Sequence, residues 1–338
     1  MPETDNLQNW ITKYRTEYKR GLPVIAPSGE EGRFDSHGVD CPFVFYHNGR
    51  YRMMYIGYDG RGYQTALAES DDLLNWRSHG VILGRGEGRG WDDVGAAGTW
   101  LLKETDALSG LPTLKKADGK YWMVYHAYPE EGYEAGPAEI GLAWTTDETL
   151  MTWNRLERPV FSWRDGEDWE RGGLYKACLL EHEGLYYLFY NAKNEASAWR
   201  EQTGVATSPD LRNWSRYEGN PVVRVVPGSW QSVFASDPFV VRDEGRWRMF
   251  YFGFDGSHAQ EGAATSDNLL EWMCAREPLL RHGTEEELDA THAHKPSVLM
   301  RDGVLYHFYC AVRPRRTVDA TLGNEYRAIT FAASAPIG

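Results

Sequence analysis

The feature that most constrains this chain is a short segment that recurs five times. Each copy has a tight turn ending in glycine and then an aromatic strand, and the five glycines are Gly49, Gly119, Gly184, Gly245 and Gly303. The residues after each turn are rich in tyrosine, tryptophan and methionine, and aromatic residues favour strands. Asn-Gly and Asp-Gly pairs, which favour two-residue hairpins, form three of the turns, and Glu-Gly forms the other two. Each copy therefore predicts a strand–turn–strand unit.

Two further positions repeat in register with the turns. Seven residues before each glycine comes a proline or alanine: Pro42, Pro112, Ala177, Pro238 and Pro296. A tryptophan closes each of the first four copies: Trp76, Trp153, Trp214 and Trp272. Five copies of a four-stranded unit predict an all-β fold, a five-bladed β-propeller. A β-sandwich with chance similarity would not explain why all three features recur together.

The N-terminus departs from this β pattern. Five apolar side chains fall on one face of a helix predicted over residues 5–20: Leu7, Trp10, Ile11, Tyr14 and Tyr18. Gly21 and Pro23 then end the helix. We therefore expect a short N-terminal helix within residues 1–22 and a single catalytic propeller domain over residues 23–338. Residues 22–37 are a candidate extra strand for the last blade.

Composition narrows the classes of partner. The 338 residues carry a formal net charge of -13, which argues against nucleic acid or an anionic membrane as partner. The four cysteines have no metal-type spacing and lie within strand patterns, so buried free thiols are expected. The first residues lack the basic and apolar regions of a signal peptide, and no apolar run is long enough to span a membrane. The prediction is a cytoplasmic protein; nothing in the sequence indicates its oligomeric state.

The propeller fold also predicts where a functional site must lie. Inner strands line the central channel and begin at the face opposite the tight turns, where the longer loops gather. The residues one before the repeated proline or alanine are Cys41, Leu111, Lys176, Asp237 and Lys295. The residues two before it are Asp40, Gly110, Tyr175, Ser236 and His294. Charged side chains are costly there unless they pair with one another or serve a function.

With these residues the chain resembles the five-bladed propeller glycoside hydrolases. That group includes family 43 arabinanases and β-xylosidases, family 32 invertases and levanases, family 117 neoagarobiose hydrolases and family 130 mannoside phosphorylases. The resemblance rests on Asp237-Pro238, on Asp40-Cys41-Pro42, and on Asp-Leu-x-x-Trp motifs at residues 72–76 and 210–214. The third inner strand departs from families 43 and 32, because Tyr175-Lys176-Ala177 carries no acid. Compared with those families, the pair of acids therefore lies on different blades, as if it were shifted around the ring.

The resemblance implies hydrolysis of an oligosaccharide or glycoside, exo-acting and inverting, by two carboxylates at the channel mouth. We assign Asp237 as base and Asp40 as acid, with the reverse also open, and Glu201 and His294 as reserve proton donors. The candidates for binding the sugar are Asp35, Tyr58, Asp59, Tyr175, Lys176, Trp199, Asp255, His292 and Lys295. Asp59 and Asp255 have a second interpretation as turn residues, since both lie in Gly-aromatic-Asp-Gly motifs.

Two other functions remain open at this point. One is a glycoside phosphorylase, in which Lys176, Lys295 and residues 313–316 bind phosphate. The other is a non-catalytic carbohydrate-binding propeller. A small carbohydrate is the expected partner in each case. No cofactor is expected; the resemblance allows a structural Ca²⁺ or Mg²⁺ in the channel, but no ligand set has a recognisable spacing.

Overall fold

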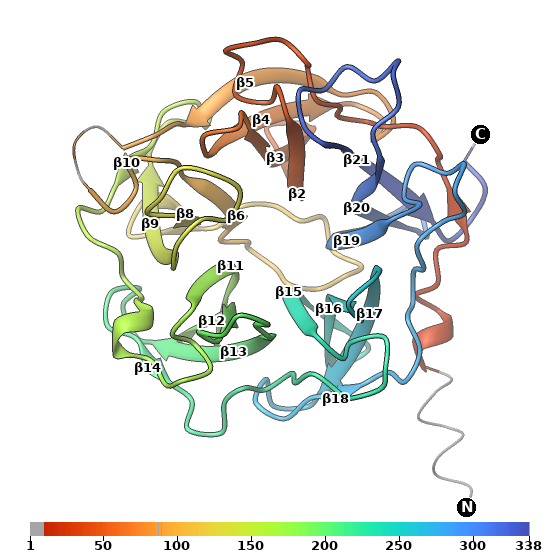
Figure 1. The fold of residues 1–338 in the computed structure, drawn as a ribbon. Helices are drawn as coiled ribbons and strands as arrows, with labels where there is room; N and C mark the ends of the chain where they lie inside the picture. Colours follow the sequence, from red (N-terminus) through yellow and green to blue (C-terminus); the bar gives the residue numbers. More distant parts are fainter. Residues whose placement is uncertain (1–9, 87, 89, 338) are drawn as a thin grey trace, which may run out of the picture.

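The computed structural model describes residues 10–86, 88 and 90–337, and these form a five-bladed β-propeller (Figure 1). The blades follow one another round the ring in chain order. Blades three, four and five join into one continuous sheet through single parallel residue pairs, Glu201 with Phe234 and Ala259 with His292. The predicted fold class is confirmed.

Each blade is an antiparallel meander of four strands. The inner strands are β2 (Gly38–His47), β6 (Ala97–Leu101), β11 (Gly173–His182), β15 (Phe234–Asp243) and β19 (His292–Arg301). The second strands are β3 (Arg50–Tyr58), β8 (Lys120–Ala127), β12 (Leu185–Lys193), β16 (Arg246–Phe254) and β20 (Val304–Pro314). The third strands are β4 (Tyr63–Ser70), β9 (Glu139–Thr145), β13 (Glu201–Ser208), β17 (Ala259–Ser266) and β21 (Glu325–Ala333). The outer strands of blades one to four are β5 (Arg77–Leu83), β10 (Asn154–Arg155), β14 (Ser215–Arg216) and β18 (Met273–Cys274).

The N-terminal segment supplies the outer strand of blade five. Strand β1 (Tyr18–Lys19) pairs with β21, so the first and last parts of the chain close the ring together. The helix predicted over residues 5–20 is wrong from residue 15 onward. Residues 10–12 are helical, residues 15–17 are irregular, and residues 5–9 lie outside the described part. Pairing with the edge of β21 overrides the helical periodicity, because the open edge offers β1 backbone partners. The added strand is Tyr18–Lys19, ahead of the expected residues 22–37, and those residues contribute a further bridge to β21, between Ile25 and Ile329.

The repeated turns form as predicted. In every turn the glycine and the residue before it both have positive φ, as at Asn48 (50°) and Gly49 (81°). This is the backbone of a two-residue hairpin turn whose twist matches its strands. The repeated tryptophans share a contact as well: each indole N–H donates to the carbonyl of the leucine three residues earlier, as Trp76 does to Leu73 at 2.9 Å.

Blade two departs from the predicted register. Its inner strand is β6, and residues 102–115 form an insertion between β6 and the short strand β7 (Lys116–Ala117), so Pro112 does not begin a strand. The insertion contacts the turn ends of two other inner strands. The Pro112 carbonyl accepts from the Tyr46 N–H at 2.9 Å, and Ala107 pairs with Arg242. In Figure 1 this segment crosses the centre of the ring. The turn face is therefore covered, and Leu111 and Gly110 are not at the site.

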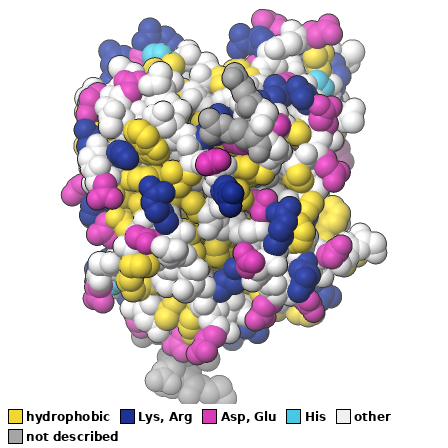
Figure 2. Space-filling view, turned by 90° about the vertical axis from the view of Figure 1, so that its left-hand side faces the viewer, with side chains coloured by type: hydrophobic (Ala, Val, Ile, Leu, Met, Phe, Trp, Pro, Cys, Tyr) yellow, Lys and Arg dark blue, Asp and Glu magenta, His cyan; other side chains and the backbone are white. Residues whose placement is uncertain are grey.

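The outside of the propeller mixes charges of both signs. Figure 2 shows basic and acidic side chains interspersed over one side of the molecule, with hydrophobic side chains between them. Cys41, Cys178, Cys274 and Cys310 are free thiols, as predicted, and three of them are buried. Within residues 10–337, positions 87 and 89 aside, no helix is long and apolar enough to cross a membrane.

Candidate active site

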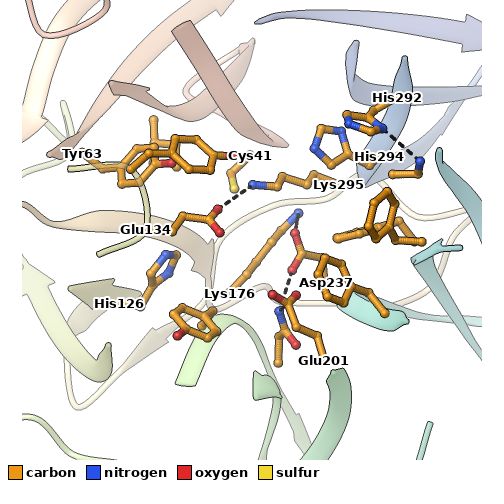
Figure 3. Close-up of a pocket in the computed structure, with 18 of the residues that line it drawn as sticks. Cys41, Tyr63, His126, Glu134, Lys176, Glu201, Asp237, His292, His294 and Lys295 are labelled. Carbon is orange, nitrogen blue, oxygen red and sulfur yellow. Dashed lines mark hydrogen bonds and ion pairs between the residues drawn. The ribbon is translucent and has the colours of Figure 1, made fainter. Parts of the chain in front are cut away.

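A cavity of about 260 Å³ lies at the end of the channel where the inner strands begin (Figure 3). Its walls come from all five blades, because each blade contributes the start of its inner strand or the loop between its second and third strands. The lining side chains that carry a polar or titratable group include Tyr63, His126, Glu134, Tyr175, Lys176, Asn191, Trp199, Glu201, Asp237, His292, His294, Lys295 and Arg327. Eight of these were predicted from the sequence: Tyr175, Lys176, Trp199, Glu201, Asp237, His292, His294 and Lys295. Their roles stay predictions.

Three inner-strand residues reach the cavity from β-bulges. The register of the inner and second strands slips at Tyr175/Ala177, Ser236/Phe239 and His294/Ser297. Asp237 and Lys295 have positive φ, 59° and 67°. A bulge leaves a residue outside the ladder and redirects its side chain, which is why such irregularities gather at active sites. Here Lys176, Asp237 and Lys295 leave the strand alternation and point into the channel.

Glu201 and Asp237 lie on the same side of the cavity. The Asn191 side-chain amide donates to Glu201 Oε2 at 3.0 Å and to Asp237 Oδ1 at 3.3 Å, so the two carboxylates share one donor. Glu201 also accepts from Ser236 Oγ (3.0 Å) and from Trp199 Nε1 (3.2 Å). Burial, and next the charge of Glu134, raises the pKa of Glu201 to about 7. Burial likewise raises the pKa of Asp237 to about 6, although Lys176 opposes the rise.

Glu134 reaches the cavity from the other side. It is not among the site residues predicted from the sequence. It lies in the loop between β8 and β9, with its carboxylate 3.8 Å from Lys295 Nζ. Its side chain is 28% exposed, so it faces the open part of the cavity. Figure 3 shows Glu134 across from Glu201, with Lys176 between them. The sequence feature that could have indicated Glu134 is its loop, residues 128–139. This loop is acidic, contains glycines and lies on the face predicted to carry the site.

Several buried polar atoms around the cavity lack a hydrogen-bond partner among the described residues. They are Lys176 Nζ, His126 Nδ1, Tyr63 Oη and Asn191 Oδ1. Lys176 has only an ion pair to Asp237 at 3.9 Å, although its side chain is 5% exposed. A buried donor or acceptor without a hydrogen bond destabilises the fold by about 1–3 kcal/mol. Several such atoms around one cavity therefore indicate a ligand that forms hydrogen bonds with them. A polyhydroxylated ligand supplies both donors and acceptors.

Asp40 is held in a buried ion cluster, which argues against the role of proton donor. Lys295 Nζ and Arg327 Nη1 each lie 2.8 Å from Asp40 Oδ2, and the Cys41 N–H donates to Oδ1 at 2.9 Å. Burial alone would raise the pKa of Asp40, but the two cations outweigh it and hold the pKa well below its usual range. An acid that stays ionised cannot donate a proton, so this cluster argues against Asp40 as the acid, and the reverse assignment, with Asp40 as base, stays a prediction.

His294 is equally unsuited to the reserve role of proton donor. Its Nδ1 lies 3.0 Å from the Cys310 carbonyl, and its Nε2 lies 3.2 Å from Arg327 Nη1. Burial, and next the charge of Arg327, lowers the pKa of His294 well below its usual value. The ring is therefore neutral at physiological pH and orients Arg327.

Replacing Asp40 by Asn is expected to destabilise the fold. The change removes the buried carboxylate between Lys295 and Arg327 and leaves them only their more exposed partners, Glu134 and Glu325. Breaking a buried ion pair in this way costs roughly 3–5 kcal/mol of unfolding free energy. Because the folded-state pKa of Asp40 is depressed, its contribution is present above the usual carboxyl value, near 4, and is lost as the pH falls below it. Urea denaturation across this pH range measures the effect, with Asp302→Asn, whose side chain is 88% exposed, as control. Equal midpoints for Asp40→Asn and wild type at pH 7 would contradict this role.

A metal ion does not fit this cluster. Asp40, His294 and Cys310 each offer one ligand atom, and the three atoms lie within 4.8 Å of one another. However, Arg327 already contacts all three side chains. Ca²⁺ and Mg²⁺ also prefer sets of oxygen ligands, which this mixed set is not.

Asp35 belongs to a structural repeat and lies outside the cavity. In the turn before the inner strand, blades two to five place an acid or amide that accepts from a buried tyrosine of the second strand: Asp92 from Tyr125, Glu170 from Tyr190, Gln231 from Tyr251 and Asp289 from Tyr309. Asp35 is the equivalent residue of blade one, where it pairs with Arg33 at 3.1 and 3.2 Å instead. Its predicted role in binding sugar is wrong.

Asp59 and Asp255 are turn residues, as their second interpretation held. Asp59 pairs with Arg85 at 2.6 Å and accepts from the N–H groups of two residues in its own loop. Asp255 accepts from the Ser257 and His258 N–H groups at 2.8 and 2.9 Å. Neither carboxylate lines the cavity, so their predicted role in binding sugar is wrong. Tyr58 lines a neighbouring hollow instead.

A five-bladed propeller with a carboxylate-lined cavity at one end of its channel defines a class: the propeller enzymes that act on glycosidic bonds. The model of the glycosyl hydrolases family 32 N-terminal domain matches residues 112–290, more than half of the sequence, and this protein belongs to that family.

Solved structures match over nearly the whole length. A structure described as a complex of BT0996 with RGII is 30% identical, with a TM-score of 0.85, over 98% of this protein and 96% of that one. A second, described as a glycoside hydrolase, is 29% identical, with a TM-score of 0.83 and the same coverage. The 1,2-beta-oligomannan phosphorylase of Thermoanaerobacter sp. (strain X514) is 26% identical over 125 residues, which are 34% of this protein and 41% of the phosphorylase. The match thus spans less than half of that relative.

Proposed function

We propose that this protein is a glycosidase that removes a terminal sugar from an oligosaccharide, with Glu201 as proton donor and Glu134 as the carboxylate that promotes attack on the sugar. The observation that carries the proposal is the placement of these two groups. Glu201 is buried, with its pKa raised to about 7, while Glu134 lies across the cavity from it. Glycoside cleavage needs one carboxyl group that stays protonated and a second that acts as base or nucleophile.

In this mechanism Glu201 donates its proton to the departing glycosidic oxygen. The hydrogen bonds from Asn191, Ser236 and Trp199 hold the carboxyl group in place, and burial keeps it protonated. Glu134 then activates a water molecule on the opposite side of the sugar, which gives inversion. Inversion stays a prediction, and NMR detection of the first anomer released from the substrate would check it. Lys176 and Lys295 supply N–H donors to the sugar hydroxyls.

The closed end of the channel supports exo action. Just beyond the bulges, the inner strands fill the channel with packed rings: Phe43 and Trp100 at 4.7 Å between centroids, and Trp100 and Phe239 at 4.8 Å. The insertion of blade two covers the turn face beneath them. A channel that is closed at one end cannot be threaded by a sugar polymer, which supports binding of the chain end.

In this proposal Asp237 raises the pKa of Glu201 and does not act as the base. The two carboxylates share the Asn191 amide, and the charge of Asp237 contributes to the raised pKa of Glu201. This replaces the assignment of Asp237 as base.

Asp237→Asn is expected to shift the basic limb of the kcat/KM profile to lower pH. Glu201 must be protonated to act, so activity should fall as the pH rises through about 7 in the wild type. Removing the neighbouring negative charge lowers the pKa of Glu201, and the fall should then begin at lower pH. Asp243→Asn, at the other end of the same strand β15, is the control. An unchanged limb in Asp237→Asn would show that Asp237 does not tune Glu201.

The RGII ligand is the first substrate to test, because the relative that is 30% identical was solved in complex with it. Release of a single sugar would support the proposal. Adding inorganic phosphate tests the phosphorylase alternative, which the match to an oligomannan phosphorylase and the unsatisfied Lys176 favour. A sugar phosphate as product would establish that reaction. The predicted phosphate-binding loop gives no support, since Arg313 is bound to Asp319 at 2.6 and 2.7 Å. Binding without cleavage of any glycoside would favour a carbohydrate-binding propeller.

A cytoplasmic location also stays a prediction. The four free thiols support it, because disulfides form mainly in oxidising compartments. Cell fractionation with an antibody to the native protein would test it.

A further inference from the structure

A second hollow of about 690 Å³ opens beside the catalytic cavity, between blades one and five. The two spaces share the side chains of Tyr63, Tyr133, His292 and Arg327. The residues that line only the second hollow are His37, Gly38, Asp40, Tyr58, Gly60, Leu322, Gly323, Asn324 and Glu325. The loop that carries Glu134 also carries Tyr133, so one segment borders both spaces. The cavity and the hollow therefore adjoin each other.

The walls of the hollow are fixed by contacts between segments that are far apart in the sequence. Thr321 Oγ1 donates to the His37 carbonyl at 2.7 Å, and the Leu322 N–H donates to the Ser36 carbonyl at 2.9 Å. Arg327 pairs with Glu325 at 2.6 Å and with Asp40 at 2.8 Å. These bonds position the loop before β21 against blade one. The hollow is thus formed before any ligand binds, as is usual for small-molecule sites.

Three tyrosines give the hollow an aromatic wall. The rings of Tyr58 and Tyr63 lie 5.1 Å apart, and that of Tyr133 lies 5.7 Å from Tyr58. Tyr133 is 50% exposed, so its ring is accessible to a ligand in the hollow. The Tyr63 hydroxyl is buried and has no hydrogen-bond partner in the described part of the chain. Aromatic rings beside hydroxyl, imidazole and amide groups suit a ligand with apolar ring faces and many hydroxyls.

We propose that the second hollow binds the sugar units next to the one that is cleaved off, so that the substrate is an oligosaccharide that runs over blades one and five. This inference rests on the proposed function. It assigns the catalytic cavity to the terminal unit and the larger hollow to at least one further unit. Leu322, Asn324 and Tyr58 then determine specificity for the oligosaccharide and do not take part in the chemistry.

The test fills the hollow without touching the catalytic cavity. Leu322→Trp places an indole at its rim, and Val318→Trp, 90% exposed on the same loop and outside the hollow, is the matched control. The substrates are the RGII ligand and the para-nitrophenyl glycoside of its terminal sugar. Leu322→Trp should lower the ratio of kcat/KM for the oligosaccharide to that for the aryl glycoside by about tenfold, the value of one lost contact of about 1.4 kcal/mol. Val318→Trp should leave the ratio unchanged.

A binding measurement separates this proposal from the proposed function. Titration calorimetry with the RGII ligand is carried out on the wild type and both tryptophan variants under conditions in which no cleavage occurs. If no substrate is cleaved but Leu322→Trp alone weakens binding about tenfold, the proposed function fails and the hollow still binds the oligosaccharide. If the oligosaccharide does not bind to the wild type, or binds to Leu322→Trp as it does to the wild type with an unchanged kinetic ratio, the second hollow is not a subsite.

Discussion

Glu201→Gln is expected to reduce turnover of an oligosaccharide by a factor of about 10²–10⁴, the usual contribution of a general acid. The amide has the shape of the carboxyl group but no acidic proton for the leaving oxygen. A para-nitrophenyl glycoside should suffer a smaller loss, because its leaving group needs little protonation. Measuring kcat for both substrates, together with the thermal midpoint, separates loss of the proton from loss of the fold.

Two observations make the Glu201 result specific. Glu183→Gln, in a turn on the opposite face with its side chain 84% exposed, should leave both activities unchanged. The Glu201→Gln variant should also lose the basic limb near pH 7 that the carboxyl group creates. If Glu201→Gln keeps wild-type turnover on the oligosaccharide, the proton donor is another residue and the proposed mechanism is wrong.

Glu134→Gln is expected to reduce turnover by a factor on the order of 10² or more for both kinds of substrate. Its carboxylate promotes attack on the sugar, a step that a better leaving group does not replace. The contrast with Glu201→Gln is therefore the informative result: a similar loss on both substrates for Glu134, and an unequal loss for Glu201. Steady-state kinetics of the two variants on the same substrates would provide it.

Glu131→Gln is the matched control for Glu134. It lies in the same loop with its side chain 63% exposed and pairs with Arg61. It should have wild-type kinetics. Suppose that Asp237→Asn loses much of its turnover on both substrates while Glu134→Gln loses none. The base would then be Asp237, as predicted from the sequence.

The propeller and the face that carries the site can be predicted from the amino-acid sequence alone. Turn glycines, aromatic strands and closing tryptophans are local signals, since each acts through backbone conformation or through residues a few positions away. Trp76, for example, bonds to Leu73. Once five copies are counted, the geometry of a blade places the starts of the inner strands around one opening. This is why Lys176, Asp237 and Lys295 could be placed at the channel mouth.

The roles of the site residues depend on the tertiary structure. Their protonation states and ion pairs are set by groups from distant parts of the chain. Asp40 is neutralised by Lys295 and by Arg327, which is 287 residues away in sequence, and no local pattern reports that contact. Glu134 lies in a loop of blade two and Glu201 begins the third strand of blade three, and the strand repeat does not encode that these two side chains meet. The pairing of β1 with β21 and the insertion that covers the turn face are likewise tertiary, since backbone partners and packing there outweigh the local propensity of these segments. A repeat specifies the scaffold, whereas the electrostatics of the site follow from which side chains the closed ring brings within a few ångströms.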